Sequence, residues 1–298
     1  MNRRQSCRGL LALLAAAGLA GCQTPPAAPP SVTPHVPKPT RPPRIGLALG
    51  GGAARGFAHI GVIQVLEEAG IRPDLVVGTS AGSLVAALYA AGRSGQELAR
   101  VAFAMDESAI TDWSFPGRGM IRGEALARYV REQTGNRTIE QLPLSLGIVA
   151  TDLDSGSGML FQRGDVGVAV RASSAVPAVF QPVKIGNREY VDGGLVSPVP
   201  VRFARQMGAE LVIAVDISSP PDGNATGDPF KMLLQTFSIM GKSINSLELK
   251  DADIVIRPPL AGVSSADFSA RKRAIDAGRE AAMAAMVALR QRVLALTH

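Results

Sequence analysis

Residues 78–82 restrict the possible folds of this 298-residue chain more than any other segment. They read Gly78-Thr79-Ser80-Ala81-Gly82, follow a short apolar run and precede a helical pattern. A serine flanked by two glycines between a strand and a helix is typical of a nucleophile elbow, in which a strained turn lifts the serine hydroxyl clear of the sheet. The alternative is a tight turn with an ordinary helix-capping serine.

Short apolar runs alternate with helical patterns along the rest of the chain. The predicted strands are residues 45–49, 75–77, 144–150, 159–162, 189–191, 211–215 and 254–256, and the predicted helices include 57–69, 83–91, 124–133 and 274–296. With 46% hydrophobic residues the chain has enough apolar side chains for a large core, which excludes a disordered tail. The alternation predicts an α/β fold with a mostly parallel or mixed sheet covered on both faces.

The histidines exclude the most familiar partner for such a serine. His35 lies in a proline-rich segment, His59 precedes the serine, and His298 is the last residue, whereas an α/β-hydrolase triad needs its histidine after the serine and the acid. We therefore expect His59 to be a packed or capping residue. The base must then be an acid.

Asp192 is the preferred acid because Gly193 and Gly194 follow it and allow its carboxylate to approach another backbone closely. The same three residues are also common in plain turns. Asp152, Asp154 and Asp216 are the competing carboxylates, of which Asp154, in Asp154-Ser155-Gly156, is typical of a hairpin turn.

A glycine-rich loop, residues 50–56, follows the first predicted strand and reads Gly50-Gly51-Gly52-Ala53-Ala54-Arg55-Gly56. Its backbone N–H groups and the following helix end suit an anion or an oxyanion. Dinucleotide-binding folds begin in the same way, but they need an acidic residue at the end of the second strand, about 20 residues on. This chain has the serine elbow there instead.

Four segments in this order resemble the patatin-like phospholipases, including the bacterial lysophospholipase and neuropathy-target-esterase-like group. They are the loop 50–56, the elbow 78–82, Ala172-Ser173-Ser174-Ala175-Val176-Pro177, and Asp192-Gly193-Gly194. The resemblance runs from about residue 45 to residue 216. It implies a three-layer α/β/α sandwich of the patatin type.

The resemblance also implies roles for individual residues. Ser80 would be the nucleophile and Asp192 the general base of a Ser-Asp dyad. The backbone amides of Gly51, Gly52 and Ala53 would form the oxyanion hole, although many relatives carry a glycine where this chain has Ala53. That alanine costs little unless the position needs a positive φ. The supporting residues would be Arg55, as a brace of the loop or of the nearby acyl ester, together with Gly56, Gly78, Gly82, Pro177, Gly193 and Gly194.

The first 21 residues are predicted to be an export signal. Arg3, Arg4 and Arg8 precede an apolar run that is too short to span a bilayer. The run ends in Leu19-Ala20-Gly21-Cys22, which resembles the lipobox of bacterial lipoproteins, so Cys22 would become the lipid-bearing first residue. Gln23 rather than Asp follows it, which by the sorting rule of such proteins favours the outer membrane.

Removing the predicted signal takes away three Arg and no acid, so the formal net charge falls from +6 to +3. The basic composition therefore does not indicate a nucleic-acid partner. Residues 22–43 form a predicted tether, because nine of the 21 residues after Cys22 are proline. The predicted enzyme domain is 44–298. Both cysteines of the chain precede this domain, so it has no thiol for a metal site or a disulfide.

The sequence thus predicts a serine acyl hydrolase that cleaves a phospholipid, a lysophospholipid or another acyl ester without metal or cofactor. A non-catalytic lipid-binding or scaffold lipoprotein of the same fold is the alternative. Two apolar stretches are candidates for an acyl pocket or a lid, or else for ordinary core: Trp113, Phe115, Met120 and Ile121 in the first, and Met232, Leu233, Leu234, Phe237, Ile239 and Met240 in the second.

Overall fold

A mixed β-sheet forms the centre of this computed structural model, which describes residues 41–106, 110–113, 118–218, 229–264 and 267–297. The predicted signal, Cys22 and most of the tether lie outside the described residues. The described strands are β1 (Ile45–Leu49), β2 (Leu75–Thr79), β3 (Gly119–Ile121), β4 (Ser145–Asp152), β5 (Gly158–Phe161), β6 (Ala178–Phe180), β7 (Val183–Ile185), β8 (Arg188–Asp192), β9 (Leu211–Val215) and β10 (Ile254–Ile256).

The strand order of the main sheet is β10-β9-β1-β2-β4-β8-β7, and β5 also pairs with β4. The five strands from β10 to β4 run parallel to their neighbours, whereas β5 and β8 are antiparallel to β4 and β7 is antiparallel to β8. The predicted mixed sheet is confirmed. Parallel strands bring the carboxyl ends of β1, β2 and β9 to the same edge, which is where ligand sites form in such folds.

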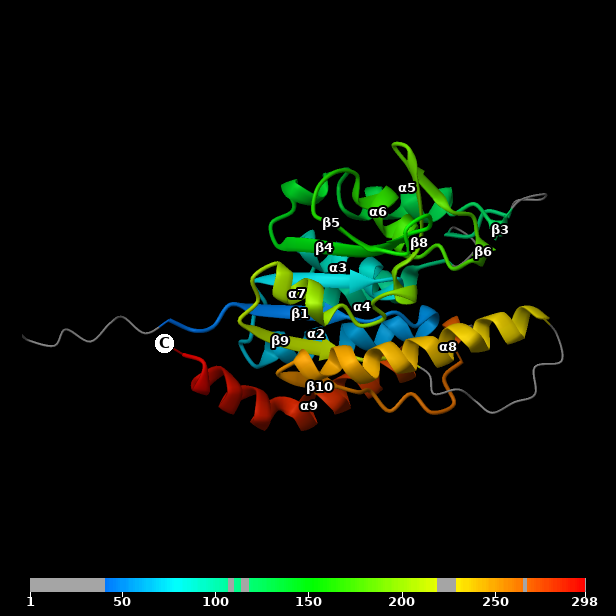
Figure 1. Ribbon diagram of the computed structural model, residues 1–298. Coiled ribbons are helices and arrows are strands. Elements are labelled where there is room, and N and C mark those ends of the chain that lie inside the picture. Colours follow the sequence, from blue (N-terminus) through cyan, green and yellow to red (C-terminus); the bar gives the residue numbers. More distant parts are fainter. Residues whose placement is uncertain (1–40, 107–109, 114–117, 219–228, 265–266, 298) are drawn as a thin grey trace, which may run out of the picture. The chain divides into compact units, whose positions relative to one another are not determined.

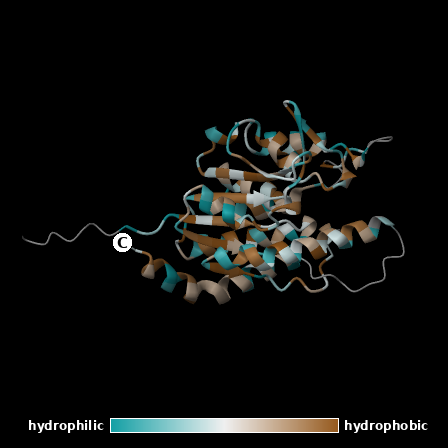
Figure 2. Ribbon diagram, in the orientation of Figure 1, coloured by the Kyte–Doolittle hydropathy of each residue, from teal (hydrophilic) through white to brown (hydrophobic). Residues whose placement is uncertain are grey.

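The helices cover both faces of the sheet (Figure 1). They are α2 (Phe57–Glu68), α3 (Ala81–Ala90), α4 (Gly95–Ala104), α5 (Glu124–Gln133), α6 (Val166–Ser173), α7 (Val201–Gln206), α8 (Pro229–Glu248) and α9 (Arg271–Ala295). Successive residues of β1 explain the layering, because Leu47 and Leu49 pack with α2, α3 and α9, while Ala48 faces α7. The central strands β1 and β9 are accordingly buried along their whole length, and hydrophobic residues predominate in the middle of the sheet (Figure 2).

All seven predicted strands and all four predicted helices are present, and β1, β9, β10 and α5 have the predicted bounds. The sequence interpretation did not contain α4, α6, α7, α8, β3, β6 and β7. Figure 1 shows α9 beside β10, and α8 contacts the 3₁₀ turns Gly193–Leu195 and Leu249–Asp251. Among the described helices, none has the length and apolar character to cross a membrane.

Candidate active site

Ser80 lies in a strained turn between β2 and α3. Its φ of 52° and ψ of −123° are outside the regions that L-residues usually occupy. Both flanking glycines are required by close approach, since a Cβ on Gly78 would lie 2.4 Å from the carbonyl oxygen of Gly82, and one on Gly82 would lie 2.1 Å from that of Leu49. The turn therefore has the geometry of the predicted elbow rather than that of an ordinary helix cap.

Two further serines hold the backbone of Ser80 in this turn. The buried hydroxyl of Ser173 accepts a hydrogen bond from the Ser80 N–H at 2.9 Å and donates one to the carbonyl oxygen of Val149 at 2.5 Å. The Ser83 hydroxyl donates to the Ser80 carbonyl oxygen at 2.6 Å. Ser173 belongs to a segment that the sequence interpretation singled out, but its link to Ser80 was not predicted.

Asp192 ends β8 and is buried, with 6% of its surface exposed. Its Oδ1 accepts a hydrogen bond from the Gly194 N–H at 2.7 Å, and its carbonyl oxygen accepts one from the Thr151 hydroxyl at 2.8 Å. Its Oδ2 is buried and accepts no hydrogen bond of good geometry from the described residues. Gly193 begins the short 3₁₀ turn that presents the Gly194 N–H.

Burial raises the pKa of Asp192 from 3.8 to about 6, and the Ser80 hydroxyl and the Gly194 N–H oppose this rise. Ser80 and Asp192 line the same cavity, and no hydrogen bond of good geometry joins their side chains in the described structure. Such bonds commonly tighten only when substrate is bound. A carboxyl group with a pKa near 6 is largely ionised at neutral pH and able to take a proton.

The glycine loop is fixed by contacts with three distant segments. The Gly50 N–H donates to the carbonyl oxygen of Val215 at 3.1 Å, and the Gly51 N–H donates to that of Pro198 at 2.9 Å. Nε2 of the fully buried His59 lies 2.8 Å from the carbonyl oxygen of Gly50. Burial lowers the pKa of His59 to about 4, so its ring is neutral at pH 7 and Nε2–H is the donor. His59 is a packed residue, as predicted, and it braces the loop.

Of the three predicted oxyanion-hole amides, Gly51 is not available, because its N–H already bonds to Pro198. The N–H groups of Gly52 and Ala53 make no hydrogen bond with the described residues, and both residues line a cavity together with Ser80. Ala53 has a φ of 49°, so this position does require the conformation that makes alanine costly.

A cavity of about 280 Å³ joins the predicted site residues, and we call it the polar cavity because Ser80, Asp192 and Lys242 line it together with apolar residues. Ser80 and Asp192 both line it. The other predicted site residues on its wall are Gly51, Gly52, Ala53, Arg55, Pro177 and Gly194, and α8 adds Leu234 and Phe237. Arg55 is 5% exposed. Gly56 packs against Ala81 at the start of α3, where an added Cβ would lie 2.9 Å from the alanine Cβ.

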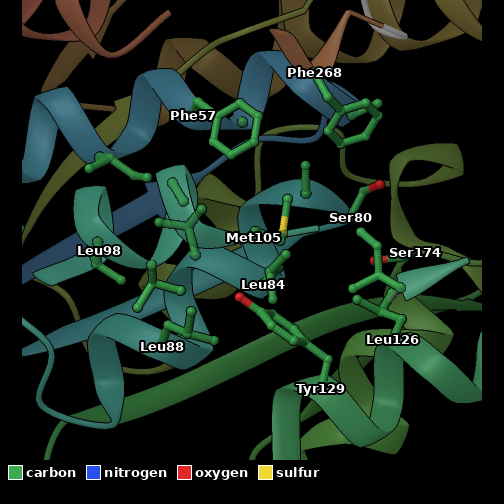
Figure 3. A pocket seen from close by; sticks show the side chains of 18 of the residues that line it. Phe57, Ser80, Leu84, Leu88, Leu98, Met105, Leu126, Tyr129, Ser174 and Phe268 are labelled. Carbon is green, nitrogen blue, oxygen red and sulfur yellow. The ribbon is translucent and has the colours of Figure 1, made fainter. Parts of the chain in front are cut away.

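A second cavity, of about 200 Å³, begins at Ser80 and is lined almost entirely by apolar side chains. Figure 3 shows Phe57, Leu84, Met105, Leu126 and others pointing into it, with Ser80 at one end and Leu88 and Leu98 away from Ser80. Ala53, Ser80 and Val176 line both cavities. Ser80 therefore stands at the junction of a polar and an apolar compartment.

Residues 47–205 match the family model for patatin-like phospholipase. The chain belongs to this family. An uncharacterized NTE family protein of Mycobacterium tuberculosis is 38% identical over 208 residues, which are 69% of this chain and 58% of the relative. The patatin-like phospholipase domain-containing protein 6 of Mus musculus is 38% identical over 184 residues, which are 59% of this chain and 14% of the mouse protein.

The patatin-like chain thus spans little more than half of the mycobacterial relative and a small part of the mouse protein. Among solved structures, VipD from Legionella pneumophila has a similar fold, with a TM-score of 0.56. The match covers 82% of this chain and 67% of VipD at 16% sequence identity. This likeness supports the α/β fold of the patatin-like domain.

The three competing carboxylates are engaged or placed elsewhere in the patatin-like fold. Asp152 forms a hydrogen-bonded ion pair with Arg188, which lowers the pKa of Asp152 to about 2. Asp154 is exposed in the turn between β4 and β5, as predicted from its sequence. Asp216 bonds to the Ser218 hydroxyl at 2.6 Å. Asp192 is the carboxylate that shares the cavity with Ser80.

The apolar cavity was not anticipated from the sequence, because its wall comes from α2, α3, α4, α5 and a 3₁₀ turn at Phe268. Neither candidate stretch for an acyl pocket lines it. In the second stretch, Leu234 and Phe237 line the polar cavity instead, and Met232 and Ile239 are exposed. Trp113 is exposed, and Phe115 lies outside the described residues. The described residues contain no group of His, Cys, Asp and Glu that suits a metal ion.

Proposed function

We propose that this patatin-like chain is a serine acyl hydrolase that cleaves the carboxylic ester of a lipid through a Ser80–Asp192 dyad. The observation that carries the proposal is the position of Ser80, which lies between an apolar cavity of about 200 Å³ and a polar cavity that contains the Asp192 carboxylate. An acyl chain fits the first compartment and the alcohol part of an ester fits the second.

In the first half of the reaction, Asp192 takes the proton of the Ser80 hydroxyl while the serine oxygen attacks the ester carbonyl carbon. The ester C–O bond breaks, Asp192 returns the proton to the leaving alcohol, and the acyl group stays on Ser80. In the second half, water attacks this acyl-enzyme with Asp192 again as the base. The fatty acid leaves and Ser80 recovers its proton.

Negative charge on the carbonyl oxygen would be stabilised by the N–H groups of Gly52 and Ala53. Both residues line the cavity, their N–H groups bond to no described residue, and His59 holds the preceding Gly50 in place, so this part of the loop is fixed before the charge develops. Removing one such donor costs about 3 to 4 kcal/mol of transition-state stabilisation in comparable sites. The N–H groups at the start of α3 add a favourable positive potential beside the Ser80 alkoxide.

The test is covalent labelling of the purified full-length chain by a fluorophosphonate, with hydrolysis of a short nitrophenyl ester measured in parallel. Ser80→Ala should lose both labelling and turnover. Asp192→Asn should lose nearly all turnover, because the two residues act as a unit. Ser243→Ala, on the exposed side of α8, and Asp154→Asn, in the β4–β5 turn, are the matched controls and should keep both. Near wild-type turnover in Asp192→Asn would refute the dyad.

A folded wild-type chain that neither labels nor turns over ester, with or without detergent micelles, would favour a non-catalytic lipid-binding or scaffold protein instead.

We also propose that Cys22 carries a lipid and anchors the chain to a bacterial outer membrane. The support is the lipobox-like segment before Cys22, which lies outside the described residues. Growth with a clickable fatty acid should label the wild-type chain and leave Cys22→Ala unlabelled. Equal labelling of the two, or none of the wild type, would contradict the anchor.

A further inference from the structure

A third cavity, of about 450 Å³, lies between the C-terminal half of α8 and the segments that follow β9 and β10. Its wall combines three basic side chains with other polar groups and with apolar surface, and we call it the basic cavity. It is formed by Lys242, Lys250, Arg257, Ser218, Asn245 and Ser246, together with Asp216 and Leu249. Ammonium, guanidinium, hydroxyl and amide groups on one concave surface are typical ligands of a phosphate group.

Asn245 is the residue that most clearly indicates a missing polar partner. It is 4% exposed and belongs to the wall of this cavity. Neither its amide nitrogen nor its amide oxygen has a hydrogen-bond partner among the described residues. A buried amide that lacks hydrogen-bond partners destabilises the folded chain. A bound ligand that offers both acceptors and a hydroxyl donor would satisfy it.

The charges in the cavity favour an anion. Among the described residues of its wall, Asp216 is the one acidic group. It accepts hydrogen bonds from the N–H and hydroxyl of Ser218 and lies 3.4 Å from the Arg257 guanidinium, which balances its charge. Lys242 and Lys250 form no ion pair with any residue that the structure describes. Two positive charges therefore remain for a ligand.

This basic cavity adjoins the proposed active site. Ser218 and Lys242 line both the basic cavity and the polar cavity of Ser80 and Asp192. Since Ser80 also lines the apolar cavity, the order across the protein is apolar pocket, Ser80, polar cavity and basic cavity. A glycerophospholipid has its parts in the same order, namely acyl chain, ester, glycerol and phosphate.

We propose that the basic cavity binds the phosphate of a phospholipid or lysophospholipid headgroup while the ester lies at Ser80. Lys242 and Lys250 contact the phosphate oxygens, and Asn245 bonds to the phosphate or to a glycerol hydroxyl. The proposal rests on the proposed ester hydrolysis for its choice of a lipid phosphate, and free phosphate is the other source of the same chemistry.

The first experiment compares two substrates that differ only in the headgroup, a lysophospholipid and the monoacylglycerol with the same acyl chain. Each is assayed with the full-length chain in the same detergent. In Lys242→Ala/Lys250→Ala, the ratio of kcat/KM for the lysophospholipid to that for the monoacylglycerol should fall about tenfold or more, because charged hydrogen bonds are lost. The double Lys→Arg variant should restore the ratio. Lys184→Ala, an exposed lysine on β7, should leave it unchanged.

The second experiment measures binding without turnover. Full-length Ser80→Ala is titrated with inorganic phosphate and with glycerol 3-phosphate, with and without the lysine substitutions. We expect glycerol 3-phosphate to bind more tightly than inorganic phosphate. We also expect this binding to be lost when Lys242 and Lys250 are replaced by alanine. If the lysine substitutions abolish this binding but the wild-type chain hydrolyses no ester, the proposed hydrolase is refuted and the anion site is retained.

An unchanged substrate ratio in an active lysine variant would overturn the headgroup proposal, even if the cavity binds inorganic phosphate. The part of Asn245 is tested separately by Asn245→Leu, which removes the unpaired amide and should raise the unfolding temperature whatever its role. If the amide binds the ligand, the substrate ratio falls as well. A more stable Asn245→Leu protein with a wild-type ratio would make Asn245 a purely structural defect and contradict its part in the site.

Discussion

Asp192→Asn is expected to make the protein more stable at neutral pH while it removes activity. In the folded chain, burial raises the pKa of this carboxyl group from 3.8 to about 6. The substitution keeps the size of the side chain and an oxygen to accept the Gly194 N–H, but it cannot ionise. The buried negative charge is therefore removed with little change in packing.

The magnitude follows from proton linkage. The folded chain binds the Asp192 proton more tightly than the unfolded chain does, because the folded-state pKa is the higher one. The stability that this proton contributes is fully present below about pH 4 and is lost as the pH rises through about 6. A shift of about two pKa units corresponds to about 3 kcal/mol, at 1.36 kcal/mol per unit. Relative to the wild type, the Asp192→Asn protein should gain this amount between pH 4 and pH 7, and no more above it.

The assay is urea unfolding of both proteins at a series of pH values, with ester hydrolysis measured on the same samples. The wild-type rate should rise with pH through about 6 as Asp192 ionises, and Asp192→Asn should stay inactive throughout. Asp154→Asn, at an exposed carboxylate, controls for the loss of a charge. A stability difference that is constant from pH 4 to pH 8, or a wild type that is the more stable protein at pH 8, would refute the reasoning.

Three further substitutions test the surroundings of Ser80. Ala53→Gly should raise the free energy of unfolding by up to about 1 kcal/mol, since glycine accepts the φ of 49° without strain, and a loss measured by urea unfolding would contradict this. Leu98→Trp places a larger side chain at the end of the apolar cavity away from Ser80. It should reduce hydrolysis of long-chain nitrophenyl esters about tenfold or more and leave hydrolysis of short-chain esters unchanged. Equal losses on both esters would exclude Leu98 from the acyl site. Leu233→Asp on α8 should reduce activity on vesicles far more than activity on a soluble short ester. The control Leu294→Asp, on the exposed face of α9, should change neither activity. Equal loss of vesicle activity in the two variants would argue against a membrane-facing α8.

The sequence predicts those parts of the fold that depend on neighbours along the chain. The strand β9 is a run of five apolar residues, and all five are buried, so its bounds are visible without any tertiary information. The elbow is local in part, because Gly78 is needed by the turn itself, whereas Gly82 is needed by the close approach of Leu49 in β1. Helix α8 is different. Its apolar residues face the polar cavity at Phe237 and solvent at Ile239, so no single buried stripe marks it as a helix.

The sequence does not show which distant residues come into contact. Three oxyanion-hole amides were predicted from the glycine loop, yet the Gly51 N–H bonds to Pro198, a residue far along the chain. Nothing in residues 50–56 indicates which amide is used in this way. The brace between Ser173 and Ser80 spans 93 residues, and the apolar cavity is assembled from several helices. These features depend on strand order, which the alternation of elements leaves open.

Backbone strain supplies an argument for the site that is independent of motifs. Among the described residues, four that are not glycine have a positive φ, namely Ala53, Ser80, Asn136 and Ala178. Asn136 follows α5 in a turn, where this conformation is common for asparagine. Ala53 and Ser80 line the polar cavity, and Ala178 directly follows the cavity residue Pro177. Each strained residue costs about 1 to 3 kcal/mol and persists only where its surroundings fix it. The buried hydrogen bonds of Ser173 and His59 do so here, which is the arrangement expected where a backbone must hold a reactive hydroxyl and its amide donors in one geometry.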